Sequence, residues 1–224
     1  DLKILSEFTA DESWELEPGD MLYLPPHFAH HGVAQNDCIT FSIGFRAPTQ
    51  TEVLDAYLQE LADSDIGDVH YSDPDLNVNT SETKIDKRAM ARFKQSLIDT
   101  INQSDTLLQS AVGRLVTQTK PSLEWLADEY IQDNDPMSLS TQFESGGILQ
   151  RNRYIRMAWT EGENHLFLFI AGEKLTLSAS NQSMINMLTG VLPISLQQWE
   201  SLQQYEGAEQ VLNALIQHGG WYWE

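Results

Sequence analysis

The chain has 224 residues and is strongly acidic, with 33 aspartates and glutamates against 13 lysines and arginines, a formal net charge of −20. Hydrophobic residues make up 41%, as in ordinary globular proteins, and no apolar run approaches the ~20 residues of a membrane-spanning helix. The charge repels phosphate backbones, so direct nucleic-acid binding is not expected except through a local patch, and a basic protein partner is favoured. The alternative is that the acidity serves solubility alone. The single cysteine, Cys38, excludes an internal disulfide and fits a reducing compartment such as the cytoplasm.

Residues 1–48 are expected to form short β-strands separated by turns, because brief apolar segments alternate with Pro, Gly, Asn and Asp. The expected strands are 21–24, 32–34 and 38–45, and the expected turns are Glu17–Asp20, Pro25-Pro26 and Gln35–Asp37. Three or four strands are too few to close a barrel or a double-sheet roll, which takes about eight. We therefore expect part of a larger β-structure that exposes strand edges and an apolar inner face.

After Thr49, a plausible N-cap, the periodicity becomes helical. Helices are expected at 49–62, 82–102 and 106–118, with a polar loop over 63–81. The second helix has an apolar stripe spaced by four, at Ile85, Ala89, Phe93, Leu97 and Ile101. Such a stripe fits either a partner chain, and thus a dimer, or packing within the chain.

Residues 121–224 are expected to form a separate α/β module whose element order is typical of a winged helix. Strands are expected at 154–159, 166–170 and 174–177, hairpin corners at 161–164 and Ala171-Gly172, and helices at 181–189, 195–203 and 208–218. The module has a net charge of −9 (4 basic and 13 acidic residues). Its only basic cluster is Arg151, Arg153 and Arg156. A protein-interaction or structural role is therefore favoured over a transcription factor.

Two runs of sequence, Glu17–Gly32 and Phe41–Pro48, resemble the cupin-type Jumonji-C oxygenases, and Tyr71–Asp75 resembles the same group. The likeness is greatest to the bacterial enzymes that hydroxylate an arginine of a large-subunit ribosomal protein. The resemblance implies an α+β chain that is the C-terminal portion of such an enzyme. It would consist of a partial double-stranded β-helix (cupin/JmjC jelly roll, first half missing) over 1–48, a helical dimerisation segment over 49–120, and a winged-helix-like module over 121–224.

The resemblance also implies Fe(II) as cofactor, 2-oxoglutarate as cosubstrate, and a basic ribosomal protein as partner. In that family the second metal histidine follows a Pro-Pro pair by four residues, which indicates His30; His27 and His31 are its neighbours. His27 stands where a glycine is common. Thr40 and Ser42 share one strand face, where they either line the barrel near 2-oxoglutarate or are ordinary strand hydroxyls.

The chain departs from the family in lacking the first two metal ligands, a His-x-Asp pair. None of its six histidines is followed two positions later by Asp or Glu. A basic residue for the far carboxylate of 2-oxoglutarate is also missing. Together with a start at Asp1, this predicts a fragment that is inactive alone and assigns no catalytic residue. The alternative hypothesis is a non-enzymatic dimeric protein-interaction module.

Overall fold

The structure, a computed structural model, describes residues 7, 9–44, 47–74, 83–120 and 138–224. Parts of several expected elements lie outside the described residues: Phe45, Arg46, Asp75, Glu82 and 121–137. The chain divides into two compact units, Asp1–Arg46 and Ala47–Glu224, which we call the N-terminal and C-terminal units. Among the described residues, no helix is long and apolar enough to cross a membrane.

The N-terminal unit contains turns and extended segments, but its described residues form no hydrogen-bonded strand. The expected turn at Glu17–Asp20 is confirmed, because the Asp20 amide donates to the Glu17 carbonyl at 3.0 Å. The prediction of strands at 21–24, 32–34 and 38–45 is wrong, because the described residues of these segments form no strand hydrogen bonds. A strand is stabilised by its neighbours, and an isolated hairpin is at best marginal in water. Part of a barrel lacks the strands against which these segments would pair.

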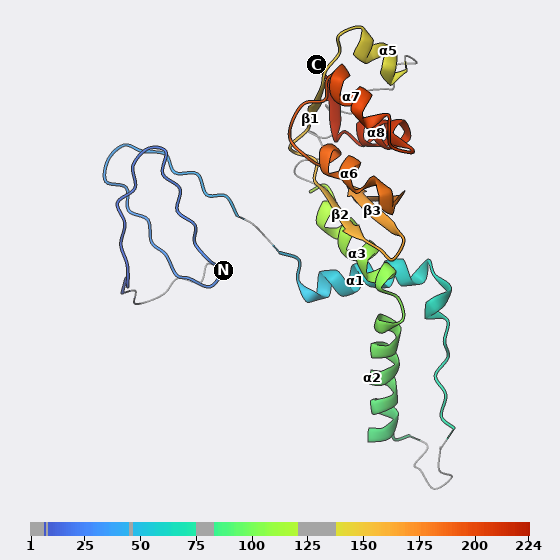
Figure 1. Cartoon of the computed structure of the whole chain (residues 1–224). Helices are drawn as coiled ribbons and strands as arrows, with labels where there is room; N and C mark the ends of the chain where they lie inside the picture. Colours follow the sequence, from blue (N-terminus) through green and yellow to red (C-terminus); the bar gives the residue numbers. More distant parts are fainter. Residues whose placement is uncertain (1–6, 8, 45–46, 75–82, 121–137) are drawn as a thin grey trace. The chain divides into compact units, whose positions relative to one another are not determined.

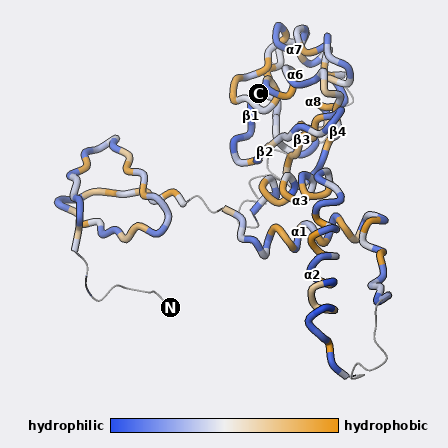
Figure 2. The backbone as a smooth tube through the Cα atoms, turned by 60° about the horizontal axis from the view of Figure 1, so that its bottom comes forward, coloured by the Kyte–Doolittle hydropathy of each residue, from blue (hydrophilic) through white to orange (hydrophobic). Residues whose placement is uncertain are grey.

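The large apolar side chains among the described residues of the N-terminal unit are exposed to solvent. Met21 is 92% exposed and Phe41 is 86% exposed. Figure 2 shows hydrophobic stretches alternating with hydrophilic ones along the described part of this unit. The expectation of an open apolar face is therefore confirmed. The other large exposed apolar residues of the unit are Trp14, Leu16, Leu22, Tyr23, Leu24, Phe28, Val33, Ile39 and Ile43.

The C-terminal unit begins with three helices: α1 (Gln50–Ala62), α2 (Lys87–Asn102) and α3 (Asp105–Thr117). α1 and α3 lie within one residue of the expected bounds. The expected start of the second helix is wrong, because α2 is capped by Asp86 and leaves Ile85 of the stripe outside the helix. Thr49 caps α1 through a reciprocal capping box with Glu52, which confirms the expected N-cap. A short 3₁₀ turn, η1 (Asp65–Gly67), follows α1. α1 packs against α3, whereas α2 buries none of its residues (Figure 1). The packing of α1 is thus within the chain, whereas Phe93, Leu97 and Ile101 of the α2 stripe remain exposed.

The rest of the unit builds a three-stranded antiparallel sheet in the order β2 (Met157–Glu161), β3 (His165–Ile170), β4 (Glu173–Ser178). The expected corner at Ala171-Gly172 is confirmed. Both residues have positive φ, 51° and 85°, as a two-residue type I′ hairpin turn requires. The helices that follow are also as expected: α6 (Gln182–Leu188), α7 (Leu196–Leu202) and α8 (Ala208–Gln217). A 3₁₀ turn, η3 (Ala179–Asn181), precedes α6.

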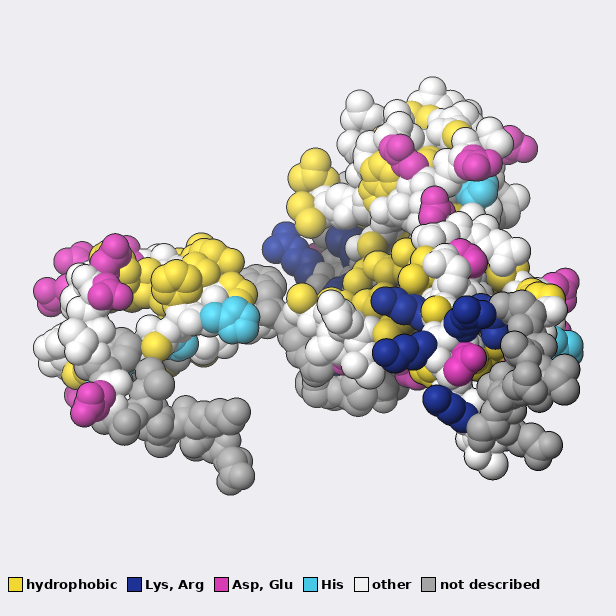
Figure 3. Space-filling model, turned by 90° about the horizontal axis from the view of Figure 1, so that it is seen from below, with side chains coloured by type: hydrophobic (Ala, Val, Ile, Leu, Met, Phe, Trp, Pro, Cys, Tyr) yellow, Lys and Arg dark blue, Asp and Glu magenta, His cyan; other side chains and the backbone are white. Residues whose placement is uncertain are grey.

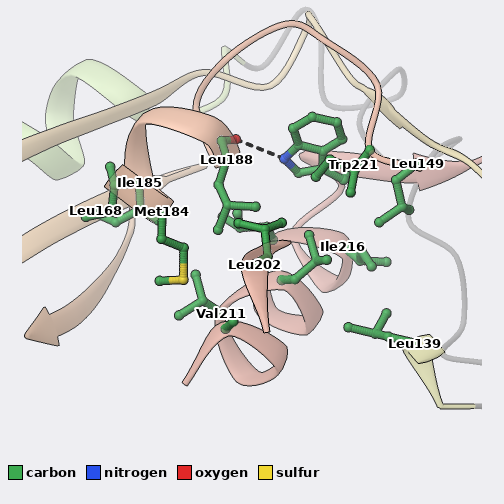
Figure 4. Packing of buried hydrophobic residues seen from close by; sticks show 14 of the residues in the cluster. Leu139, Leu149, Leu168, Met184, Ile185, Leu188, Leu202, Val211, Ile216 and Trp221 are labelled. Carbon is green, nitrogen blue, oxygen red and sulfur yellow. Dashed lines mark hydrogen bonds between the residues drawn. The ribbon is translucent and has the colours of Figure 1, made fainter. Parts of the chain in front are cut away.

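Three further short elements complete the module: α5 (Leu139–Glu144), β1 (Leu149–Arg151) and β5 (Trp221–Trp223). β1 pairs with β5 in an antiparallel register and also bridges Ile194. This pairing ties the C-terminus to the start of the sheet region. In Figure 4, Trp221 of β5 enters the core, where its Nε1–H donates to the Leu188 carbonyl at 3.1 Å.

β3 is buried on both faces, as its uninterrupted apolar sequence suggests. Leu166, Leu168 and Ile170 belong to the main core with α6, α7 and α8. The alternate residues Phe167 and Phe169 are also buried, and the Phe169 ring lies against Gly113 of α3. α3 therefore packs on the sheet of the C-terminal module. The contact is reinforced by hydrogen bonds from Arg114 to the Gly172 carbonyl and from the Gly172 amide to Thr117.

Replacing Gly113 by alanine is expected to lower the free energy of unfolding by about 1–3 kcal/mol, the usual cost of overpacking. A Cβ at this position would lie 2.3 Å from the Phe169 ring. Denaturant unfolding of the chain measures the effect. The double variant Gly113→Ala/Phe169→Leu should recover part of the loss because leucine removes the clashing ring atoms. If the single variant is as stable as the parent chain, the close approach of α3 to β3 is wrong.

Candidate functional site

The predicted metal-binding segment is held by a tight turn over Pro25–Phe28. The Phe28 amide donates to the Pro25 carbonyl at 3.4 Å, and His27 has a φ of 70°. A positive φ at the third position is the mark of a type II turn, and glycine adopts it without strain. The family's common glycine at this position is thereby explained, and His27 adopts the same conformation at a steric cost.

His30 lies just beyond this turn, and its Nδ1 is 3.3 Å from the Phe28 carbonyl oxygen. A carbonyl can only accept, so this hydrogen bond places the imidazole proton on Nδ1. In the neutral imidazole the lone pair is then on Nε2, and His30 as a residue is exposed. Metal-binding histidines commonly use this arrangement, in which a backbone carbonyl fixes the tautomer and the other nitrogen binds the metal. The local geometry of His30 therefore fits a metal ligand.

Thr40 and Ser42 alternate with Ile39, Phe41 and Ile43 along the chain, but both faces of this segment are exposed. Within the described part of the N-terminal unit, no hydrogen bond joins either hydroxyl to His30. No group of three or more His, Cys, Asp or Glu side chains among the described residues lies close enough together to hold a metal. The three predicted site residues are therefore not assembled into a site by this chain.

We expect His27→Gly to raise the population of the Pro25–Phe28 turn. The left-handed conformation costs a non-glycine residue about 1–2 kcal/mol, which exceeds the roughly 0.5–1 kcal/mol entropic cost of glycine. Nuclear Overhauser contacts between Pro25 and Phe28 measure the population. Ala29→Gly is the matched control: the φ of Ala29 is not positive, so this change should only loosen the segment. If the two glycine substitutions change the population of the turn equally, His27 is not strained.

The Tyr71–Asp73 part of the third resemblance motif folds back on α2. Arg92 of α2 donates from Nε to the Tyr71 hydroxyl at 3.0 Å and forms an ion pair with Asp73. The Tyr71 ring stacks on Phe93 with a centroid distance of 4.2 Å. These contacts attach the loop to one section of α2. They indicate that this motif stabilises the helical segment.

Sequence reasoning missed a cleft at the C-terminal end of α1, where it expected only a polar loop. The cleft has a volume of about 420 Å³ and combines leucine side chains with three carboxylates. Its lining residues are Leu58, Leu61, Ala62, Asp63, Ser64, Asp65, Gly67 and Asp68. The signal in the sequence is the spacing of three aspartates directly after a helix. Such a surface is complementary to a basic partner.

Comparison with known proteins finds two matching regions, with residues 54–95 between them in neither. Residues 1–53 match the JmjC domain, and residues 96–222 match the ROXA-like winged helix. The first match confirms that the N-terminal unit is part of a cupin-type domain. The second includes α3 and the whole sheet, in agreement with the packing of α3 on β3.

Two curated relatives are similar over long stretches. The ribosomal protein uL16 3-hydroxylase of Escherichia coli is 25% identical over 224 residues, which is all of this chain and 58% of that protein. A Haemophilus influenzae protein described as "Probable ribosomal oxygenase" is 31% identical over 76% of this chain and 42% of its own length. The chain thus spans about half the length of these relatives.

Solved structures of E. coli YcfD, a ribosomal oxygenase, share the fold. The complex with cobalt and 2-oxoglutarate superimposes with a TM-score of 0.63 at 18% identity, covering 81% of this chain and 48% of that one. A complex with cobalt and succinic acid gives a TM-score of 0.63 at 19% identity, over 81% and 48% of the two chains.

Proposed function

The chain belongs to the ROXA-like winged-helix family, and on this premise we propose that it is the C-terminal part of a protein hydroxylase. The whole protein would use Fe(II) and 2-oxoglutarate to hydroxylate an arginine of a large-subunit ribosomal protein, in the cytoplasm. The observation that carries the proposal is His30, whose Nδ1 faces a backbone carbonyl and whose Nε2 is available, within the JmjC match. The two curated relatives that match over most of this chain are named a ribosomal protein hydroxylase and a probable ribosomal oxygenase.

His30 is proposed to supply one of three iron ligands, which in this class of enzyme are two histidines and a carboxylate. The other two ligands would come from residues outside this chain, because none of its six histidines is followed two positions later by Asp or Glu. When bound, iron supplies the oxidising chemistry that breaks an unreactive C–H bond. The Phe28 carbonyl would keep the proton of His30 on Nδ1, so that Nε2 is free to bind the metal. Thr40 and Ser42 are proposed to face 2-oxoglutarate once their segment is paired in the complete barrel.

The acidic surface is proposed to attract the basic substrate. The net charge of −20 and the carboxylates of the α1–η1 cleft favour encounter with a lysine- and arginine-rich ribosomal protein. Such steering acts mainly on the rate of association and weakens as salt is added.

The chain is proposed to consist of three domains, 1–48, 49–120 and 121–224. A homodimer is proposed to form through α2, in the second of them. The apolar stripe of α2 is only partly covered: Tyr71 stacks on Phe93, but Leu97 is 68% exposed and no residue of the helix is buried. Figure 3 views the molecule from the α2 side and shows hydrophobic surface next to lysine and arginine side chains. The exposed basic residues of this segment, Lys84, Lys87, Arg88 and Lys94, form no ion pair with the residues described. In a symmetric interface the stripe of a second copy would cover this stripe.

A second candidate is a non-enzymatic dimeric interaction module, favoured by the single metal-ligand candidate in the described residues. The two are distinguished by 2-oxoglutarate consumption with uL16 and Fe(II), measured for this chain and for the whole protein. The oxygenase proposal expects turnover by the whole protein and none by the chain alone. If the whole protein binds uL16 but consumes no 2-oxoglutarate, the interaction module is the correct function.

A further inference from the structure

The basic residues of the winged-helix module lie away from its last three helices. After Lys174 the sequence contains no lysine or arginine, so α6, α7 and α8 carry no basic side chain. A winged helix that lays a helix in a DNA groove needs cations there to contact phosphates. Lys174 itself donates to the Ser110 hydroxyl at 2.8 Å and lies over the Phe167 ring. The remaining cations are grouped at the β1–β2 loop, residues 152–156, and at Arg151 before it.

The β1–β2 loop is fixed by inward-pointing polar groups. Asn152 is 2% exposed; its Nδ2 donates to the Gly219 carbonyl at 2.8 Å, and its Oδ1 accepts from the Tyr154 amide at 3.0 Å. The Arg151 guanidinium donates to the carbonyls of Gly220 and Ile155, at 2.9 and 2.7 Å. Burial lowers the pKa of Arg151 to about 10, so this side chain remains charged at neutral pH. The loop therefore has a defined conformation before any ligand binds.

The other side chains of the loop point outward. Arg153 and Arg156 are exposed, and the ring of Tyr154 is about half exposed. Arg153 makes no hydrogen bond or ion pair with the described residues. Arg156 uses one donor, to the Gln118 carbonyl at 2.6 Å, and Lys120 lies two residues further on. Of the carboxylates on the adjoining strands, Glu173 pairs with Arg114 and Glu224 accepts from Gln150. Neither is paired with the loop.

We propose that the β1–β2 loop is a binding site for single-stranded nucleic acid, with phosphates on Arg153 and Arg156 and a base stacked on Tyr154. Arginine binds phosphate oxygens through paired donors, and an exposed aromatic ring between cations is the recurring platform for unstacked bases. The net charge of the chain does not prevent this at physiological salt. Charges more than about 8 Å away are largely screened, and the local patch dominates. The site is independent of the oxygenase proposal.

The test is fluorescence anisotropy of the whole chain with a labelled oligouridylate, its oligodeoxythymidylate counterpart, and a labelled polyglutamate of the same length. Binding of the oligonucleotides is expected at about 50 mM salt, with log K falling against log salt at a slope of about −2 for two or three phosphate contacts. Arg153→Ala/Arg156→Ala should weaken it about tenfold or more. Tyr154→Ala should weaken it at least about fivefold, whereas Tyr154→Phe keeps the ring and should retain affinity. Comparison of the two oligonucleotides decides between RNA and DNA.

Arg88→Ala, which removes an equally exposed arginine from α2, is the matched control and should change affinity by less than about twofold. Three results would overturn the proposal. One is the absence of oligonucleotide binding at low salt. Another is equal weakening by Arg88→Ala, which would mean a diffuse charge effect. The third is that polyglutamate binds as tightly as the oligonucleotides and that Tyr154→Ala does not weaken its binding. This result would identify a site for acidic proteins instead.

Discussion

His30→Ala in the whole protein is expected to reduce 2-oxoglutarate turnover by more than about 100-fold. Removing even an outer-shell partner of a metal ligand costs about 10–100-fold in metal affinity or activity, and loss of the ligand itself exceeds that. The Nδ1 contact of His30 with the Phe28 carbonyl leaves Nε2 as the binding atom. Fe(II) affinity, measured by titration, should fall together with turnover. A loss of turnover with unchanged iron affinity would mean that His30 acts on the substrate.

The neighbouring histidines provide matched controls for this prediction. His27 occupies the strained turn position, and His31 is the adjacent exposed residue. In a completed strand, adjacent side chains point to opposite faces, so only one of His30 and His31 can enter the barrel. His27→Gly and His31→Ala should therefore keep iron affinity within about threefold of the parent protein. If His31→Ala abolishes iron binding and His30→Ala does not, the register of this segment is shifted by one residue.

The helices and the main sheet could be predicted because their signals are local. Thr49 and Glu52 specify the start of α1, and the Ala171-Gly172 pair specifies a hairpin between two apolar runs. β1 and β5 were missed because strands of three residues are too short to show alternation. Their pairing depends on Trp221 entering a core built from distant residues, which no local pattern reveals. The same limit applies to the packing of α3 on β3, which requires a glycine at position 113 opposite a phenylalanine.

The candidate site was predictable only in part, for a physical reason. The Pro25–Phe28 turn and the position of His30 are set by nearby residues, so the sequence motif locates them. Strand pairing in the N-terminal unit depends on partners that are distant in sequence. The predicted strands consequently remain unpaired over the described residues, and among these no hydrogen bond joins Thr40 or Ser42 to His30.

Leu97→Ala is expected to weaken the proposed homodimer by at least about 100-fold. Burying a leucine side chain is worth about 1.5–3 kcal/mol, and in a two-fold symmetric interface each substitution removes two such contacts. Leu97 is well suited to the test because it is exposed in the single chain, so its loss should leave the stability of the fold nearly unchanged. Sedimentation velocity over a range of concentrations gives the dissociation constant. Gln95→Ala, a truncation of similar size nearly opposite on the same helix, should leave it unchanged. Equal weakening of the dimer by the two variants would indicate altered helicity of α2. An unchanged dissociation constant for Leu97→Ala would show that the stripe is covered by something other than a second copy.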